Sequence, residues 1–225
     1  MYLTKFVVKS EDYKNNILIR LSFNNTFLMH REIQSMFSGD EGRRVVGDSL
    51  FRIEEDIDKA TIYIQSLSVP DPSKSQLFNT ISETMSFIDM DEYYKDIKDG
   101  DTFKFVLNCR PTVQKRNNEN GNSKKRVIYN PSKREKWLYG KGIKCGFELL
   151  NLFEKDSIKY NVDKAAALGS LSDSKNTKNK PKEFYIDGFS YVGSLKVKNV
   201  ELLKQTLRKG IGPSKAHGFG LLILL

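Results

Sequence analysis

The chain has 225 residues, of which 39% are hydrophobic and 11% aromatic, and its formal net charge is +9. This length permits one large domain or two small ones, each able to bury a core. The apolar content excludes a disordered tail.

The charge is unevenly distributed. Residues 1–100 hold 12 Lys+Arg and 17 Asp+Glu, whereas residues 101–225 hold 25 and 11. Within the second part, residues 110–144 hold 11 basic residues and only two acidic ones. A basic field confined to one part of a chain favours a polyanionic partner, because phosphate contacts release counterions. The alternative is a solvated lysine-rich surface.

The cysteines and histidines show no metal-ligand spacing. Cys109 and Cys145 cannot form a disulfide framework, and with two histidines in the chain we expect no metal and no cofactor. The apolar run 221–225 is too short to cross a bilayer, and residues 2–8 alternate like a strand instead of a signal peptide. We therefore expect a cytoplasmic protein with no membrane partner.

The first part of the chain reads as a strand at 2–8, an irregular stretch, and a helix that starts after the capping residues 24–26. On that helix Met29, Ile33, Met36 and Phe37 form an apolar stripe, and His30 lies at its rim. Further strands are expected at 50–54, 60–67 and 85–88.

The second part repeats a similar order. The expected elements are a strand at 102–108, a helix starting at Pro131, strands from Phe147 and within 183–198, a helix from Val200 and a strand at 221–225. The pattern β-α-β-β followed by β-α-β-β-α-β predicts an α+β fold. We expect two tandem ferredoxin-like (RRM-like) domains, 1–100 and 101–225, with a C-terminal glycine-rich loop.

The C-terminal stretch 199–225 combines a helix with a glycine-rich turn. Asn199 is a candidate N-cap, and the helix stops at Gly210. The turn that follows carries lysines, and its backbone N–H groups could receive phosphate. The alternative is a tight connection between a helix and a strand.

This turn, GIGPSKAHGFGLLIL, together with the opening MYLTKFVV, resembles the CasE family of CRISPR-associated endoribonucleases. Members of that family cut the hairpin repeat of precursor CRISPR RNA in type I-E systems. The resemblance implies tandem ferredoxin-like domains, a CRISPR repeat RNA hairpin as substrate, and other Cascade subunits as partners. It implies neither a metal nor a cofactor.

The resemblance also assigns the candidate catalytic residue. In the family, the helix after the first strand carries a Tyr-x-x-His motif, and FLMHR aligns with it so that the histidine is His30. Histidine suits proton transfer because its pKa is near neutral. From the residues alone, a lone histidine beside an apolar stripe is more often a packed rim residue.

The tyrosine position of the motif corresponds to Phe27, which cannot transfer a proton. Either His30 acts with help from a lysine or arginine, or another hydroxyl fills the role, or cleavage is slow. The candidate hydroxyls are those of Tyr13, Thr26 and Ser35. For His217 we expect a packing role, with a role as a second candidate base as the alternative.

RNA binding has support from the basic middle, KKRVIYNPSKREKWLYGKGIKCGF, which is similar to the basic stretch of the family. Basic residues on a loop and a following helix can bind the phosphates of both strands of a hairpin stem, which proteins recognise by its shape and backbone. Trp137 is expected in the core. The expected RNA-binding residues are Arg31, Arg43, Arg44, Lys124, Lys125, Arg126, Lys133, Arg134, Lys136, Lys209, Ser214 and Lys215.

The family reading implies a metal-independent endoribonuclease in which His30 promotes attack of the 2′-OH on the adjacent phosphate. The products would be a cyclic phosphate and a 5′-hydroxyl, with the protein remaining bound as a Cascade subunit. A non-catalytic RNA-hairpin-binding subunit on the same fold is the main alternative. A third reading is a basic protein that binds any polyanion nonspecifically.

Overall fold

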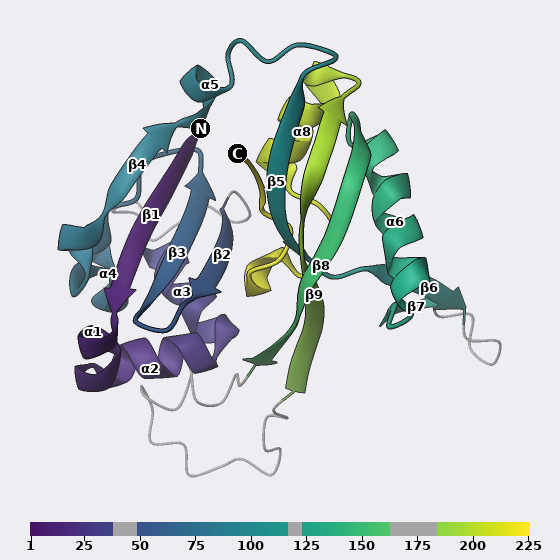
Figure 1. Ribbon diagram of the computed structural model, residues 1–225. Coiled ribbons are helices and arrows are strands. Elements are labelled where there is room, and N and C mark those ends of the chain that lie inside the picture. Colours follow the sequence, from purple (N-terminus) through teal and green to yellow (C-terminus); the bar gives the residue numbers. More distant parts are fainter. Residues whose placement is uncertain (38–48, 117–122, 163–183) are drawn as a thin grey trace. The chain divides into compact units, whose positions relative to one another are not determined.

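The computed structural model describes residues 1–37, 49–116, 123–162 and 184–225 (Figure 1). The chain forms two compact units, Met1–Glu92 with Lys159–Ile186 and Tyr93–Ile158 with Asp187–Leu225. Each unit therefore takes residues from two stretches of sequence. The division into two domains, 1–100 and 101–225, stays a prediction.

A four-stranded sheet with the order β2-β3-β1-β4 forms the first unit. Its strands are β1 (Tyr2–Lys9), β2 (Leu50–Glu55), β3 (Lys59–Ser66) and β4 (Ser86–Asp89). Neighbouring strands run antiparallel throughout. The helices are α1 (Ser10–Asn15), α2 (Ile17–Asn24), α3 (Thr26–Ser35), α4 (Gln76–Asn79) and α5 (Met90–Tyr93), with 3-10 turns η1 (Pro72–Lys74) and η2 (Ser82–Thr84). Helices between β1 and β2 and again between β3 and β4 give the ferredoxin-like order.

One face of this sheet carries the core of the first unit, and the helices cover it (Figure 1). Phe6, Phe51 and Ile62 from the strands, and Met29 and Ile33 from α3, are each 0% exposed. Burial of each side chain of this size stabilises the fold by roughly 1.5–3 kcal/mol relative to leaving it exposed. The apolar stripe predicted for α3 is thereby confirmed.

The stretch between β1 and α3 differs from the prediction. It was expected to be irregular, but α1 and α2 occupy it. Asn16 caps α2, because its Oδ1 accepts hydrogen bonds from the backbone N–H groups of Leu18 at 2.9 Å and Ile19 at 3.3 Å. Ile19 and Phe23 then bury the inner face of the helix. The short length of these helices hid their period in the sequence.

The second unit repeats the topology, with sheet order β10-β5-β9-β8. Its strands are β5 (Thr102–Cys109), β8 (Phe147–Val162), β9 (Phe184–Val197) and β10 (Leu222–Leu224), and its helices are α6 (Pro131–Lys144) and α8 (Val200–Lys209). β5 runs antiparallel to both β9 and β10. The predicted α+β fold with two ferredoxin-like sheets is confirmed.

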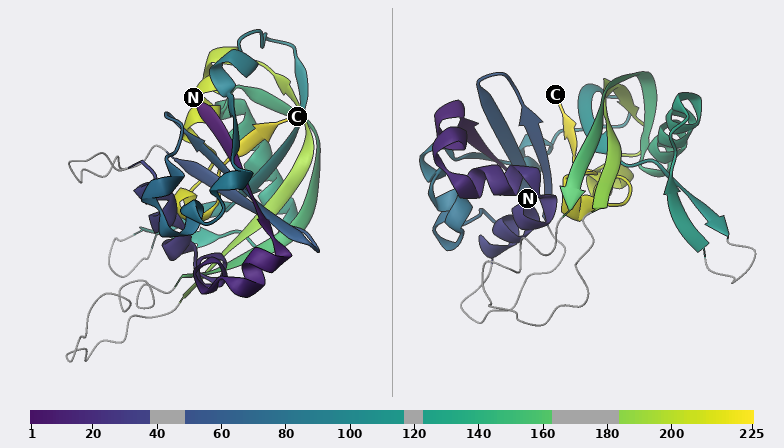
Figure 2. Two further views of the ribbon diagram at one scale, coloured as in Figure 1. Left: turned by 90° about the vertical axis from the view of Figure 1, so that its left-hand side faces the viewer. Right: turned by 90° about the horizontal axis from the view of Figure 1, so that it is seen from below.

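A hairpin that was not predicted separates β5 from α6. Its strands, β6 (Thr112–Arg116) and β7 (Ser123–Val127), pair antiparallel with Thr112 opposite Val127. Figure 2 shows this hairpin extending away from the sheet beyond α6. Its strands are polar and lysine-rich, so they lack the apolar alternation that marks a half-buried strand.

No described helix is long and apolar enough to cross a bilayer. Within the four described ranges, no three His, Cys, Asp or Glu side chains group in a way that could hold a metal ion.

Candidate functional site

His30 lies on α3, and local sequence fixes the start of this helix. The side chain of Asn25 caps it by accepting a hydrogen bond from the Phe27 backbone N–H at 3.1 Å. The imidazole ring is half-buried and stacks on the ring of Phe51 in β2, with centroids 6.5 Å apart and 21° between the planes. The helix and the sheet together therefore hold the ring in one orientation.

The environment of His30 favours a neutral ring. Its Nδ1 is buried and makes no hydrogen bond to any described residue. Burial lowers the pKa of His30 from its ordinary value of 6.5, because the charged imidazolium loses hydration. Nε2 is not among the enclosed atoms, so it is the ring nitrogen that a substrate could reach. It can act as a general base in the neutral tautomer that carries its hydrogen on Nδ1.

The neighbours expected to assist His30 are placed as follows. Phe27 lies one turn earlier on α3 and, like Arg31, is half-buried. The Thr26 hydroxyl donates to the Asn161 carbonyl at 3.4 Å, and the Ser35 hydroxyl donates to the Glu32 carbonyl at 2.7 Å. The predicted alternatives for the missing tyrosine are unchanged: help from a lysine or arginine, a hydroxyl of Thr26, Ser35 or Tyr13, or slow cleavage.

Glu32, two residues after His30, has a structural role that the sequence did not indicate. Its carboxylate is 6% exposed and accepts hydrogen bonds from the Ser75 hydroxyl at 2.8 Å and the Leu77 backbone N–H at 3.1 Å. These bonds tie α3 to the start of α4. Glu32 therefore holds the helix that carries His30.

Arg52 is a second residue that the sequence reasoning missed. It follows Phe51 in β2, is 5% exposed, and pairs through Nη2 with Glu54 Oε1 at 2.7 Å. Its Nε and Nη1 have no hydrogen-bond partner among the described residues. Burial lowers its pKa, while the negative charge of Glu54 acts in the opposite direction. In the sequence, Arg52 could have been recognised as a lone arginine within an otherwise apolar predicted strand.

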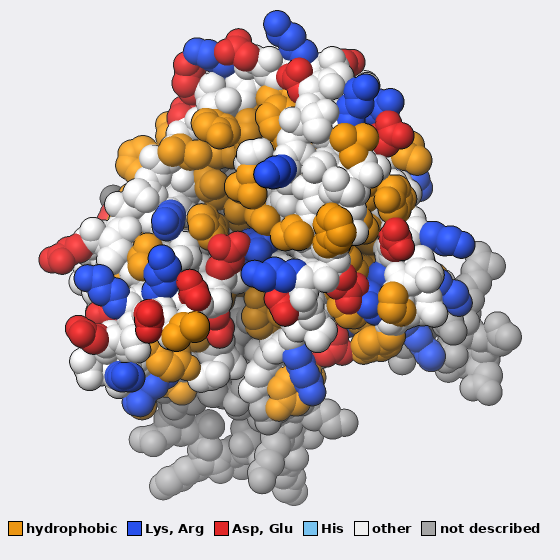
Figure 3. Space-filling model, in the orientation of Figure 1, with side chains coloured by type: hydrophobic (Ala, Val, Ile, Leu, Met, Phe, Trp, Pro, Cys, Tyr) orange, Lys and Arg blue, Asp and Glu red, His pale blue; other side chains and the backbone are white. Residues whose placement is uncertain are grey.

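The basic residues of the second unit lie on β7 and α6. Lys125 and Arg126 are exposed on β7, and Lys133 and Lys136 are exposed on α6. Asn130 caps α6 by accepting from the Lys133 backbone N–H at 3.0 Å. Lys and Arg side chains gather along the edge of the face in Figure 3 where α6 and the hairpin lie. The side chain of Lys124, and all of Arg43 and Arg44, lie outside the described residues.

Arg134 does not share this exposure. It is 5% exposed, and it donates to Glu154 through Nε at 3.0 Å and Nη2 at 2.7 Å. Its Nη1 donates to the Tyr129 carbonyl, and the guanidinium lies 3.8 Å from the centroid of the Phe189 ring. Because these contacts occupy the guanidinium, we leave Arg134 out of the proposed RNA-contact residues and assign it a structural role.

The glycine-rich turn is built from left-handed backbone. Gly210, Gly212, Gly218 and Gly220 have φ of 70°, 83°, 80° and 95°, and Ser214 has φ of 66°. A Cβ on Gly212 would lie 3.2 Å from the Trp137 ring. Trp137 therefore packs against the turn, but it is half-buried, so the prediction that it lies in the core was wrong.

Basic groups surround this turn. Lys209 is exposed at the end of α8, and Lys215 is half-buried in the 3-10 turn η3 (Lys215–His217). Burial lowers the pKa of Lys215, and the charges of Lys141 and Lys209 lower it further. Amines grouped in this way create a positive potential that favours binding of an anion. The role of His217, in the same turn, stays open.

Arg110 connects the turn to the sheet, and the sequence reasoning did not single it out. Its Nε donates to the Asp187 carbonyl at 3.1 Å, and its Nη1 donates to the Ser214 hydroxyl at 3.5 Å. The Asp187 carboxylate in turn accepts from the Tyr129 hydroxyl at 2.6 Å, which raises the pKa of Tyr129. These bonds link the turn to the residue before the α6 cap.

A protein-family model described as CRISPR associated protein matches residues 1–225. The chain belongs to the CRISPR-associated protein family. The CRISPR-associated endoribonuclease Cse3 of Thermus thermophilus is 25% identical over 227 residues, which cover 99% of this chain and 98% of Cse3. The resemblance to CRISPR-associated endoribonucleases that the sequence indicated is thereby confirmed.

Solved structures share the fold of this CRISPR-associated protein. The structure of CRISPR endoribonuclease Cse3 bound to 19 nt RNA has 24% identity and a TM-score of 0.74, and the match covers 100% of both chains. A chain of a CRISPR RNA-guided surveillance complex has 20% identity and a TM-score of 0.60, with 100% of this chain and 99% of that chain covered.

Proposed function

We propose that this CRISPR-associated protein is a metal-independent endoribonuclease that binds the CRISPR repeat hairpin and cleaves precursor CRISPR RNA. The observation that carries the proposal is the half-buried imidazole of His30, stacked on Phe51 at the family's histidine position, with its pKa lowered by burial. The family membership supports the assignment.

The proposed reaction starts with the proton of the ribose 2′-OH, which passes to Nε2 of His30. The 2′-oxygen then attacks the adjacent phosphorus, and the bond from phosphorus to the 5′-oxygen breaks. The 5′-oxygen takes a proton from water and His30 returns its proton to water, so the products are a 2′,3′-cyclic phosphate and a 5′-hydroxyl. Base catalysis of this kind contributes about 10²–10⁴-fold to the rate, and positioning of the strand in line supplies more.

The exposed basic residues of β7 and α6 would hold the hairpin stem through its phosphates, with the lysines around the glycine-rich turn as a second contact. A structure of Cse3 bound to 19 nt RNA supports RNA as the ligand. Arg31, Arg43, Arg44 and Lys124 stay in the proposed contact set, in addition to Lys125, Arg126, Lys133, Lys136, Lys209, Ser214 and Lys215.

We also propose that the protein stays with its product as a subunit of a CRISPR surveillance complex in the cytoplasm. The match to a chain of such a complex supports membership in a surveillance complex. Product retention would make cleavage a single-turnover event.

One observation favours a second candidate function, a non-catalytic RNA-hairpin-binding subunit. Phe27 occupies the position of the family tyrosine and cannot transfer a proton. In that case the basic surface would bind the hairpin without cutting it.

Single-turnover incubation of a uniformly labelled CRISPR repeat RNA with excess protein in EDTA distinguishes the two functions. The endoribonuclease yields one cut beside the hairpin, and mass spectrometry of the 5′ fragment shows a cyclic phosphate. Tight binding with no cut supports the binding subunit. A cut that appears only when Mg²⁺ is added contradicts metal independence.

A further inference from the structure

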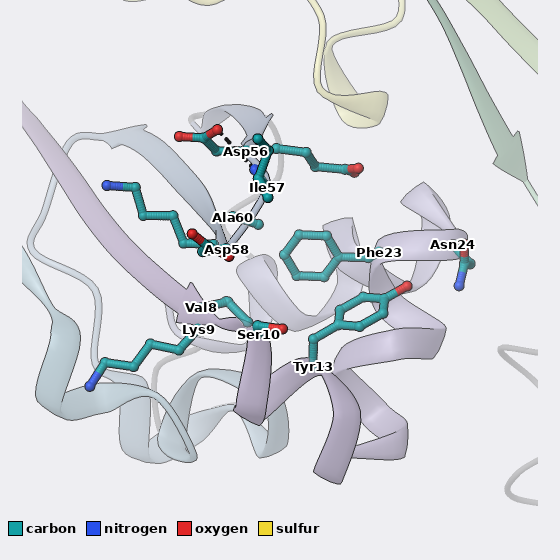
Figure 4. A pocket seen from close by; sticks show the side chains of 12 residues that line it. Val8, Lys9, Ser10, Tyr13, Phe23, Asn24, Asp56, Ile57, Asp58 and Ala60 are labelled. Atoms are coloured by element: carbon teal, nitrogen blue, oxygen red, sulfur yellow. Dashed lines mark hydrogen bonds between the residues drawn. The ribbon is translucent and has the colours of Figure 1, made fainter.

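A cavity of about 290 Å³ opens on the first unit, away from α3 residues that surround His30 (Figure 4). It lies where the end of β1, helices α1 and α2, and the turn between β2 and β3 meet. Its lining consists of Val8, Lys9, Ser10, Tyr13, Phe23, Asn24, Glu55, Asp56, Ile57, Asp58, Lys59 and Ala60. The proposed RNA-contact residues contribute none of this lining.

Two aromatic rings form one wall of the cavity. Tyr13 from α1 and Phe23 from α2 pack edge to face, with centroids 5.9 Å apart and 88° between the planes. Figure 4 shows both rings beside the cavity. The faces of aromatic rings attract a cationic group, which gains most where it is partly desolvated.

Carboxylates form the opposite side. Glu55, Asp56 and Asp58 are exposed along the β2–β3 turn. The turn is held in place, because Asp56 Oδ1 accepts from the Ile57 backbone N–H at 2.8 Å and the Asp58 carbonyl accepts from the Ser10 backbone N–H at 3.0 Å. An aromatic wall facing carboxylates on a fixed turn suits a guanidinium or ammonium group.

Two lysines also flank the cavity. Lys9 and Lys59 face each other at the ends of β1 and β3. Asp12 Oδ2 accepts a hydrogen bond from the Lys9 backbone N–H at 3.1 Å, which brings a further carboxylate to the end of β1. Acidic groups therefore outnumber the lysines here, in a chain whose net charge is +9.

An exposed apolar side chain at the cavity indicates a macromolecular occupant. Ile57, at the tip of the turn, lines the cavity and is 95% exposed. A small cation would gain little from this side chain, whereas a polypeptide could cover it together with the cavity.

We propose that this acidic and aromatic cavity receives an arginine or lysine side chain from a basic, apolar segment of another protein subunit. RNA is disfavoured as the occupant because the carboxylates of the turn repel phosphate. The identity of the partner as a subunit of the surveillance complex rests on the proposed function, but the cavity itself is independent of cleavage.

The test is assembly of the full chain with the other subunits of its own surveillance complex and CRISPR RNA. Two variants address the cavity: the double variant Glu55→Lys with Asp58→Lys, which avoids the Asp56 bond that holds the turn, and Ile57→Asp. Asp96→Lys, an exposed acidic position in the second unit, is the matched control. We expect each cavity variant to lower incorporation at least tenfold and the control to incorporate normally.

Two further readouts make the outcomes decisive. Hairpin cleavage by each isolated variant should equal wild type, which shows that the variants fold. A photo-crosslinking amino acid at position 57 should label a subunit peptide that contains lysine or arginine. Normal incorporation of both cavity variants, or crosslinks only to RNA or to a second copy of this chain, would overturn the proposal. Assembly through this surface without any hairpin cleavage would instead overturn the proposed endoribonuclease activity.

Discussion

The imidazole ring of His30 lies nearly parallel to the ring of Phe51, at 21° and with 6.5 Å between centroids. Phe51 is 0% exposed in the core of the first unit, and Nδ1 of the histidine stacked on it is buried without a hydrogen-bond partner among the described residues. The same burial lowers the pKa of His30 from 6.5. A core phenylalanine thus contacts the ring of the candidate base, and burial of that ring favours its neutral form.

This relationship predicts how cleavage depends on pH. Because the folded pKa is lower than 6.5, the neutral base persists to lower pH, and the acid limb of the single-turnover rate should lie below pH 6.5. Phe51→Leu should expose the ring and move the midpoint of that limb upward, toward 6.5. Rates measured from pH 4.5 to 8 test this. The same midpoint in both proteins would show that burial of His30 does not determine the acid limb of the rate.

The same pKa also predicts a stability change. Between the folded pKa and 6.5 the unfolded chain binds more protons at His30 than the folded chain does, so the free energy of unfolding rises with pH across this window. The contribution is fully present above 6.5 and is lost as pH falls through the folded pKa. His30→Gln should reduce that slope in urea titrations. An unchanged slope would contradict the burial argument.

Arg134 should matter for stability more than for RNA binding. Arg134→Met leaves the Glu154 carboxylate without its partner, and breaking a buried pair costs roughly 3–5 kcal/mol. Because the Glu154 side chain is 33% exposed, we expect the lower end of this range. Lys133→Met, on the exposed side of α6, is the control and should change the urea midpoint little. Weaker hairpin binding by Arg134→Met at unchanged stability would show that its guanidinium contacts RNA.

The exposed basic residues should determine the salt dependence of hairpin binding. Replacing Lys133 and Lys136 by alanine should weaken binding to any hairpin of similar shape. It should lower the slope of log affinity against log salt by about one for each lost phosphate contact. Fluorescence anisotropy between low and moderate salt measures this slope. Lys98→Ala, an exposed position before β5, should leave it unchanged. Equal slopes for all variants would remove α6 from the proposed interface.

Gly188 should be intolerant of any side chain. A Cβ at this position in β9 would lie 2.1 Å from the ring of Phe219, which is 0% exposed in the glycine-rich turn. Gly188→Ala should therefore lower the free energy of unfolding by about 3 kcal/mol and loosen the turn. Gly140→Ala has open space on α6 and should raise it by about 0.5–1 kcal/mol. Equal stability of the two variants would contradict this packing.

The sequence predicted the parts of the fold that depend on local signals. The capping residues 24–26 and Asn199 were recognisable, and Asn25 and Asn199 each accept the expected backbone hydrogen bond. The central strands were predicted from their apolar alternation. The hairpin of β6 and β7 was missed because its strands lack apolar alternation, and α1 and α2 were missed because they have only six and eight residues.

Site residues were harder to predict because their roles depend on partners distant in sequence. Arg134 looked like its exposed neighbours on α6, but Glu154, twenty residues away, pairs with it. The buried donors of Arg52 and the bond from Arg110 to Ser214 likewise arise from contacts that no local pattern contains. His30 was found only through its place in a family motif.

The most direct test of the proposed endoribonuclease is single-turnover cleavage of its own CRISPR repeat RNA in excess EDTA. Three reactions are compared: wild type, His30→Ala, and wild type with a 2′-deoxy substrate at the cut site. The account predicts one cut beside the hairpin only when wild type acts on the unmodified RNA. Hairpin binding should be retained in all three reactions. Cleavage by His30→Ala at the wild-type rate would contradict it and direct attention to His217.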